Sequence, residues 1–227
     1  MRIPLDSAFC VPIGHRCPCS VLVLYNLGSK RGDPSQPTYS GIVAQGRDGN
    51  LYSTAPGGGA KSGGAVFKVT PAGTLSVLYS FTGGGSDGFA PMGGLTLGTD
   101  GNFYGTTFEG GESNLGTVFK ITSTGRLTTL YTFTGIGDGS TPQAPPIQGT
   151  DGNFYGTTTG GTVYELTPSG NLTTLYTFDT GGSPTTPLVE GTDGNFYGTT
   201  SDWCTRSLPL GSLLSCIRFP YQMAGNL

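Results

Sequence analysis

The sequence predicts an all-β protein, a β-propeller of about four blades with four strands in each blade. Three short sequence blocks recur in one fixed order, and the copies of the first block are 52, 51 and 42 residues apart, which is the period typical of a propeller blade. The recurring segments are rich in Thr, Val, Tyr and Phe, which fit a pleated sheet, and Gly and Pro separate them. No segment shows a helical period with capping residues.

The three blocks define the repeat. The first block reads Asp-Gly-Asn-(Leu/Phe)-Tyr and begins at Asp48, Asp100, Asp151 and Asp193. The second reads Val-(Phe/Tyr)-(Lys/Glu)-(Val/Ile/Leu)-Thr and begins at Val66, Val118 and Val163. The third reads Leu-Tyr-x-(Phe/Leu) and begins at Leu24, Leu78, Leu130 and Leu175. A shared order for three different markers indicates tandem structural units.

Each period predicts four strands, as the second copy illustrates. Residues 94–97 form the first strand, and residues 103–107 form the second. The Asp-Gly pair between them predicts a tight turn, because Gly accepts a positive φ and Asp hydrogen-bonds its own turn backbone. We therefore expect structural turn residues at Asp48, Gly49, Asp100, Gly101, Asp151, Gly152, Asp193 and Gly194.

A Gly-rich loop of variable length leads to the third strand of this copy, residues 117–122, and a second tight turn leads to the fourth, residues 127–133. Alternate residues of the fourth strand place apolar side chains on both of its faces. Both faces are therefore expected to pack against neighbouring sheets.

The chain divides into a non-repeat leader at residues 1–20, propeller repeats at 21–200 and a non-repeat tail at 201–227. It enters on a fourth strand, residues 21–27, and leaves the repeat after a second strand, residues 196–200. If the ends meet, the N-terminal strand completes the last blade. Residues 213–219, which are apolar but do not match the repeat, are the candidate for its third strand. The propeller is either a small closed ring or a fragment of a larger one. A solenoid of another type is the alternative to the propeller fold itself.

Composition excludes several classes of protein. Only 11% of residues are charged and the net charge is −3, so there is no basic nucleic-acid footprint. No apolar run is long enough to predict a membrane span. Residues 1–20 make a poor signal peptide, because they hold three prolines and no unbroken apolar region.

The chain holds one histidine and five cysteines, an odd number that predicts no simple disulfide framework. The one metal-like cluster comprises Cys10, His15, Cys17 and Cys19, but its Cys-x-Cys spacing is unusual for zinc and no second ligand pair follows. We therefore predict no metal and no cofactor.

The three blocks of the second copy, at residues 100–107, 116–122 and 127–133, resemble the GloVer tandem repeat of bacterial choice-of-anchor proteins. The resemblance covers roughly residues 21–200. It implies propeller-like repeats and an extracellular or cell-surface setting, and it supplies no catalytic residues. The chain departs from that family in its leader and in its tail.

Two groups of polar residues are candidate ligand-binding positions. Gln45, Gln148 and Glu190 lie three residues before a repeated Asp, on first strands that line the channel of a propeller, where Leu97 holds the same position. Asp87 and Asp138 lie in Gly-rich loops outside the repeated turns. The alternative interpretation is plain solvation of the channel and ordinary turn chemistry.

The variable loops, residues 56–65 and 109–116, lie on the opposite face from the tight turns and form the candidate binding surface. Phe89, Phe108 and Trp203 are isolated aromatics, interpreted as packing residues with loop anchoring as the alternative.

The sequence thus favours a non-enzymatic propeller module for interaction with an unknown protein or carbohydrate ligand. The first alternative is a propeller enzyme, a lyase or glycan-active protein, with its site at the channel mouth. Such a site normally gathers His, Glu or Arg from several blades, and this chain has few of them there. The second alternative is a truncated gene fragment.

Overall fold

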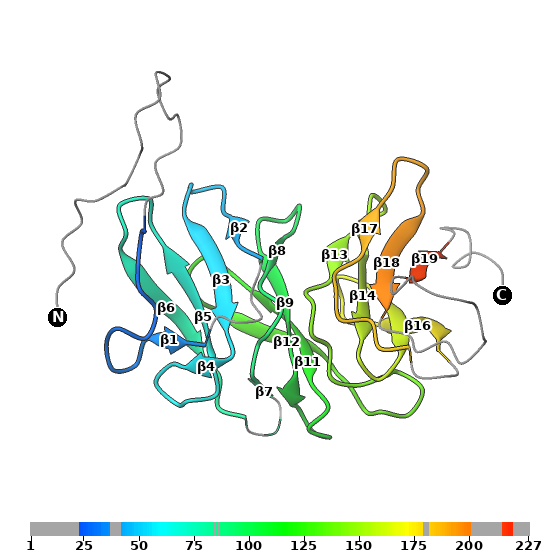
Figure 1. Cartoon of the computed structure of the whole chain (residues 1–227), viewed down its shortest axis with the longest axis horizontal. Helices are drawn as coiled ribbons and strands as arrows, with labels where there is room; N and C mark the ends of the chain where they lie inside the picture. Colours follow the sequence, from blue (N-terminus) through cyan, green and yellow to red (C-terminus); the bar gives the residue numbers. More distant parts are fainter. Residues whose placement is uncertain are drawn as a thin grey trace, which may run out of the picture.

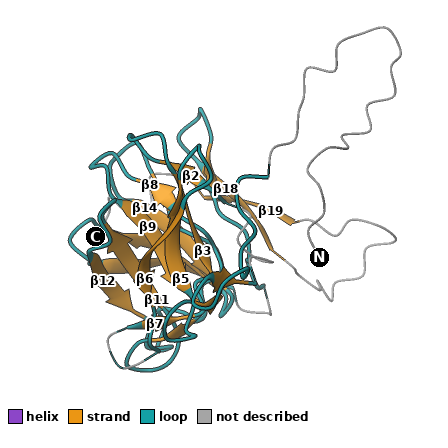
Figure 2. Ribbon diagram, turned by 90° about the vertical axis from the view of Figure 1, so that its left-hand side faces the viewer, coloured by secondary structure: helices purple, strands orange, loops and turns teal. Residues whose placement is uncertain are grey.

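The computed structural model describes residues 23–36, 42–83, 85, 87–178 and 182–200, together with a strand at 215–219. These residues form strands, turns and loops with no helix (Figure 2). The predicted all-β class is therefore confirmed. Among the described residues no helix has the length and apolar character that crossing a bilayer requires.

Three antiparallel sheets have four strands each. The first sheet contains β2 (Ala44–Gln45), β3 (Leu51–Ala55), β5 (Ala65–Val69) and β6 (Leu75–Ser80) in that order. The second contains β8 (Thr96–Leu97), β9 (Phe103–Thr107), β11 (Thr117–Ile121) and β12 (Leu127–Thr132). The third contains β13 (Ile147–Gln148), β14 (Phe154–Thr158), β15 (Thr162–Leu166) and β16 (Leu172–Thr177). Sequence order equals spatial order within each sheet, which is the meander expected of a propeller blade.

The last sheet has three described strands, β17 (Val189–Glu190), β18 (Phe196–Thr200) and β19 (Ser215–Phe219). The backbone of β19 pairs with β18 along its whole length, from Phe196 opposite Phe219 to Thr200 opposite Ser215. The C-terminal segment therefore supplies the third strand of this sheet, as the sequence predicts.

The first sheet lies at one end of the longest axis of the molecule, the second in the middle, and the third and last sheets together at the other end (Figure 1). The described part of the chain is thus an open arc and does not close a ring on itself. Residues 23–27, expected to be a strand of the last blade, form no strand and pack instead against the first sheet. Among the described residues no strand pairs with them to complete a hydrogen-bonded ladder.

The Asp-Gly turns share one hydrogen-bond pattern. In the first sheet Asp48 Oδ1 accepts the backbone N–H of Asn50 at 3.2 Å, while Asp48 Oδ2 accepts Asn50 Nδ2 at 2.7 Å and the hydroxyl of Tyr52 at 2.7 Å. Asp100, Asp151 and Asp193 make the same three contacts with the Asn and Tyr that follow them. Gly49 has a φ of 77°, which residues with a side chain rarely adopt. The Asp closes the hairpin and also fixes the tyrosine of the second strand.

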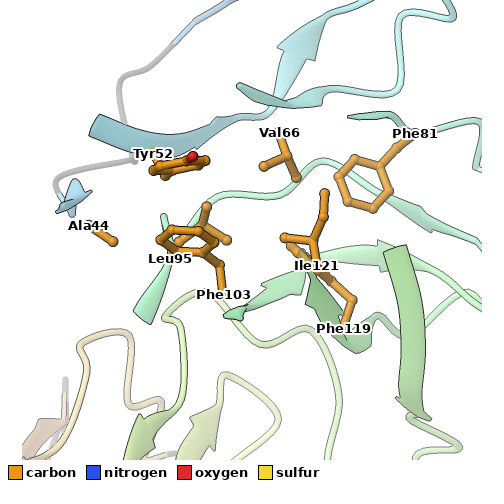
Figure 3. Close-up of a cluster of buried hydrophobic side chains, with 8 residues drawn as sticks. All are labelled: Ala44, Tyr52, Val66, Phe81, Leu95, Phe103, Phe119 and Ile121. Atoms are coloured by element: carbon orange, nitrogen blue, oxygen red, sulfur yellow. The ribbon is translucent and has the colours of Figure 1, made fainter. Parts of the chain in front are cut away.

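Adjacent sheets pack through stacked aromatic rings. Tyr52 of β3 stacks on Phe103 of β9 with ring centroids 4.1 Å apart, in the cluster shown in Figure 3. The same contact joins Tyr104 to Phe154 at 3.8 Å and Tyr155 to Phe196 at 4.1 Å. Consecutive side chains of a strand point to opposite faces, so Phe faces the preceding sheet and Tyr faces the following one. The Phe103-Tyr104 and Phe154-Tyr155 pairs thus contact both neighbours of their sheets.

The Tyr–Asp pairs of the first two sheets, Tyr52–Asp48 and Tyr104–Asp100, make stability depend on pH. Hydrogen bonds from Asn102 and Tyr104 outweigh burial, which alone would raise the pKa of Asp100, and hold that pKa below its ordinary value. Burial and the hydrogen bond to Asp48 raise the pKa of Tyr52 to about 12. Folding therefore favours the carboxylate form of Asp100 and the neutral phenol of Tyr52 at every pH between the two pKa values.

We therefore expect the free energy of unfolding to be nearly constant from about pH 5 to about pH 9. It should fall below about pH 4, as the carboxylates with lowered pKa take up protons. It should fall again between about pH 10 and about pH 12, as Tyr52 ionises. Denaturant unfolding followed by circular dichroism across this range checks it, and Tyr52→Phe should reduce the alkaline loss. An alkaline loss unchanged in that variant would contradict the assignment.

Candidate functional site

Two short ribbons on the variable-loop face join neighbouring parts of the repeat. β1 (Pro34–Ser35) pairs with β4 (Gly57–Gly58), and β7 (Gly88–Phe89) pairs with β10 (Glu109–Gly110). In each ribbon the segment that enters a sheet pairs with the loop between the second and third strands of that sheet. Both ribbons lie along the lower edge of the arc in Figure 1. They bring the variable loops of consecutive sheets together.

A hollow of about 430 Å³ lies between these two ribbons. It is lined by Ser35, Gln36, Pro56, Gly57, Gly58, Ser62, Phe89, Ala90, Met92, Phe108 and Glu109. This volume suits a small ligand. The hollow lies on the face that the sequence singles out as a binding surface.

Two half-buried aromatic residues, Phe89 and Phe108, line this hollow from adjacent segments. The backbone N–H of Phe108 donates to the carbonyl of Ala90 at 3.0 Å, and that of Ala90 donates to Gly63 at 3.0 Å. Ala90 has a φ of 53°. Gln36 and Thr141, at the equivalent positions of the other copies, share this left-handed conformation, so it belongs to the repeat and not to the hollow alone.

The aromatic lining is specific to this hollow. Between the second and third sheets, Ser140 replaces Phe89, Thr159 replaces Phe108 and Gly160 replaces Glu109. There the hydroxyl of Thr159 donates to the carbonyl of Thr141 at 2.8 Å, and the two threonine hydroxyls are hydrogen-bonded to each other. Two aromatic rings and a carboxylate therefore distinguish the first hollow from its counterpart in an otherwise regular repeat.

The polar lining can accept and donate hydrogen bonds. Glu109 is the one carboxylate among the lining residues and is half-buried, while Ser35, Gln36 and Ser62 supply hydroxyl and amide groups. The sequence predicts the loop 56–65, which includes Ser62, and it presents Phe89 and Phe108 as packing residues. Gln36 was not predicted, because it lies outside both the recurring blocks and the variable loops and no sequence signal pointed to it.

Two of the three predicted channel residues, Gln148 and Glu190, join neighbouring sheets by hydrogen bonds. Gln148 Oε1 accepts the backbone N–H of Thr99 at 2.8 Å. The carboxylate of Glu190 accepts the backbone N–H of Thr150 at 3.1 Å and its hydroxyl at 2.8 Å. Gln45 donates from Nε2 to the carbonyl of Gly49 at 3.5 Å and is exposed. The structure does not bring these three side chains into one cluster with the hollow.

Asp87 and Asp138 close the loops that follow the fourth strands. Asp87 Oδ2 accepts the backbone N–H and hydroxyl of Thr82 at 2.7 and 2.8 Å. Asp138 Oδ2 likewise accepts from Thr134 at 2.8 and 3.0 Å, and from the hydroxyl of Tyr131 at 2.9 Å. These bonds outweigh burial and lower the pKa of Asp138. Oδ1 of Asp138 is buried and has no partner among the described residues.

Cys10, His15, Cys17, Cys19 and Trp203 lie outside the described residues. In the part of the chain that the structure describes, no three His, Cys, Asp or Glu side chains gather as metal ligands would.

Comparison with solved structures finds proteins of similar fold. An aldose sugar dehydrogenase from Streptomyces coelicolor, in its PQQ-bound form, matches with a TM-score of 0.55 and 14% identity over 79% of this chain and 60% of that one. A streptogramin B lyase matches with a TM-score of 0.53 and 17% identity over 86% and 57%. A gluconolactonase from Xanthomonas campestris matches with a TM-score of 0.50 and 17% identity over 79% and 58%.

This chain thus spans less than two thirds of the length of each of these proteins. At these identities the likeness concerns the fold, and it confirms the propeller class. A search of curated proteins finds no match. A family model described as Gloeobacter/Verrucomicrobia repeat matches residues 19–207.

Proposed function

Because the chain belongs to the Gloeobacter/Verrucomicrobia repeat family, we propose that it is a non-enzymatic propeller module of the bacterial exterior. In this proposal it binds a carbohydrate in the hollow between the two loop-face ribbons. The observation that carries the proposal is the pair of half-buried rings, Phe89 and Phe108, beside the carboxylate of Glu109.

The chemistry of the lining supports a sugar ligand. The face of an aromatic ring carries partial negative charge and attracts the C–H groups on one face of a pyranose ring. The hydroxyl groups of the sugar would then meet Glu109, Gln36 and the two serines, which offer both donors and acceptors. An apolar surface with a few placed polar groups is the usual composition of a small-molecule site.

The same lining favours binding over turnover. Glycoside hydrolysis normally uses two carboxyl groups across the scissile bond, and the lining supplies one, Glu109. The runner-up function is a propeller enzyme acting as a lyase or on glycans. The names of the similar structures (lyase, gluconolactonase, dehydrogenase) describe those proteins, and they motivate testing turnover here.

We expect the chain to bind at least one member of a panel of immobilised glucose, galactose, mannose and N-acetylglucosamine oligosaccharides. Phe108→Ala should weaken that binding at least about tenfold, because an aromatic anchor is lost, and Glu109→Gln should weaken it as well. Titration calorimetry with the oligosaccharide that binds measures both effects. The matched control is Ile136→Ala, since Ile136 is 88% exposed on a loop outside the hollow and should leave affinity unchanged.

Two results would contradict this function. Release of new products from any oligosaccharide, lost in Glu109→Gln, would favour the enzyme. Binding that Phe108→Ala and Ile136→Ala leave equally intact would place the ligand outside the hollow.

A further inference from the structure

The first sheet has an open apolar face at one end of the arc. A hollow of about 390 Å³ on this face is lined by Val43, Leu51, Phe67 and Val69 of the sheet and by Leu24 and Leu27 of the N-terminal segment. Val43 is 56% exposed there. Exposed apolar surface of this kind marks an interaction site.

This face corresponds to one half of the interface that the chain makes between its own sheets. Leu95 of the second sheet and Leu188 of the last one occupy the position of Val43, and they are 1% and 2% exposed because a preceding sheet covers them. Leu51 occupies the position of Phe103, which is stacked on Tyr52 of the preceding sheet. The open face is thus shaped to receive the second strand of another repeat.

The N-terminal segment already lies where the fourth strand of that other sheet belongs. A β-carbon on Gly73 would lie 2.5 Å from the carbonyl oxygen of Leu24. The corresponding distances are 2.7 Å from Gly125 to Leu78 and 2.6 Å from Gly170 to Leu130, and both of these pairs join consecutive sheets. Leu24 therefore packs on the first sheet as Leu78 packs on the second. No sheet of the described residues includes this N-terminal segment as its fourth strand.

The last sheet offers those three strands. It contains β17, β18 and β19, and no fourth strand among the described residues pairs with β19. Its strand β18 has the sequence Phe-Tyr-Gly-Thr-Thr, the same as β9 and β14. Val189 on this sheet is 65% exposed, whereas Ala44 and Ile147 at the same position pack toward a following sheet.

Polar groups at the two ends also match. Between the inner sheets, Gln148 accepts the backbone N–H of Thr99 and Glu190 accepts that of Thr150. Gln45 has the position of Gln148, and Thr192 has the position of Thr99 and Thr150. Gln45 belongs to the first sheet and Thr192 to the hairpin of the last sheet, and both are exposed.

We propose that a second copy of this chain docks head to tail, its last sheet covering the first sheet of its partner. The N-terminal segment of each copy then lies beside the three-stranded last sheet of the other as its fourth strand, and Gln45 accepts the backbone N–H of Thr192. A head-to-tail contact of this type forms a ring when its rotation closes. Two copies bring together eight sheets, within the usual propeller range of about four to eight.

Sedimentation velocity of the full chain under reducing conditions tests the proposal. We expect a species of twice the chain mass. Val43→Glu alters the open face of the first sheet, here called the head, and Val189→Glu alters the open face of the last sheet, here called the tail. Both residues are exposed, so each variant should keep its fold. Each substitution buries a charge in the docked interface and should raise the dissociation constant at least about tenfold. Ile136→Glu, on an exposed loop between the ends, is the matched control and should leave the mass unchanged.

Mixing the two variants distinguishes head-to-tail docking from a symmetric contact. The Val189→Glu copy keeps an intact head and the Val43→Glu copy keeps an intact tail, so the mixture should recover dimers that neither variant forms alone. Absence of recovery in the mixture would overturn the proposal. So would a wild-type chain that stays monomeric at every concentration, or a dimer that both substitutions leave unchanged.

Discussion

Replacing Tyr104 with alanine is expected to lower the free energy of unfolding by about 3–5 kcal/mol, the range for loss of a fully buried aromatic side chain. The ring of Tyr104 is buried in β9 and stacks on Phe154 of the next sheet with centroids 3.8 Å apart. Its hydroxyl donates to Asp100 Oδ2 at 2.9 Å. The substitution therefore removes a contact between two sheets and a hydrogen bond within a turn.

Two variants separate these contributions. Tyr104→Phe keeps the stacked ring and loses the hydrogen bond, so we expect a smaller loss of about 1 kcal/mol. Tyr197→Ala changes the same position in β18, where the side chain is half-buried, and should cost clearly less than Tyr104→Ala. Guanidinium unfolding followed by far-ultraviolet circular dichroism measures all three. Equal losses for Tyr104→Ala and Tyr197→Ala would show that stacking between sheets does not determine the stability.

The fold class could be predicted because each copy of the repeat carries the same strand and turn pattern. A β-strand exposes alternate residues on alternate faces, so the consecutive Phe and Tyr of the first block must face opposite ways. From the sequence alone this block predicts only a hairpin and a strand. Its role between sheets depends on which sheets are neighbours, and that became visible only with Tyr52 stacked on Phe103. Recurrence of the aromatic pair was the signal that pointed to it.

The channel residues show the limit of reading polarity from sequence. Gln148 and Glu190 were identified as polar where apolar side chains were expected. Their partners are the backbone N–H groups of Thr99 and Thr150, 49 and 40 residues away. Every residue other than proline has a backbone N–H, so such a partner cannot be recognised from the sequence. The ligand role of these side chains stays a prediction, while their hydrogen bonds join adjacent sheets.

The loop-face hollow could be predicted only as a surface. Loop length indicated the face, but the hollow depends on the pairing of β7 with β10, two-residue segments about twenty residues apart. Strands this short have no recognisable sequence pattern. Phe89 and Phe108 therefore looked like isolated packing residues, and their convergence came from the tertiary structure.

Replacing Gly116 with alanine is the second substitution with a large expected effect. Gly116 precedes the third strand of its sheet and has a φ of 93°, which costs an alanine about 1–2 kcal/mol. A β-carbon there would lie 2.4 Å from the carbonyl oxygen of Thr107 and 2.7 Å from Cδ of Pro142, which precedes the third sheet. Backbone atoms cannot move aside as a flexible side chain can. We therefore expect a total loss of at least about 3 kcal/mol.

Gly161 provides the matched control, because it holds the same position before the third strand of the third sheet. Its φ is 86°, but the nearest atom to a β-carbon is the carbonyl oxygen of Gly182 at 3.2 Å. Gly161→Ala should therefore lose only the backbone contribution, about 1–2 kcal/mol. The difference between the two variants isolates the close approach of Thr107 and Pro142 to Gly116 from the φ requirement that both glycines share. If thermal and denaturant unfolding gave equal losses, the φ of the glycine alone, and not this close approach, would explain its recurrence.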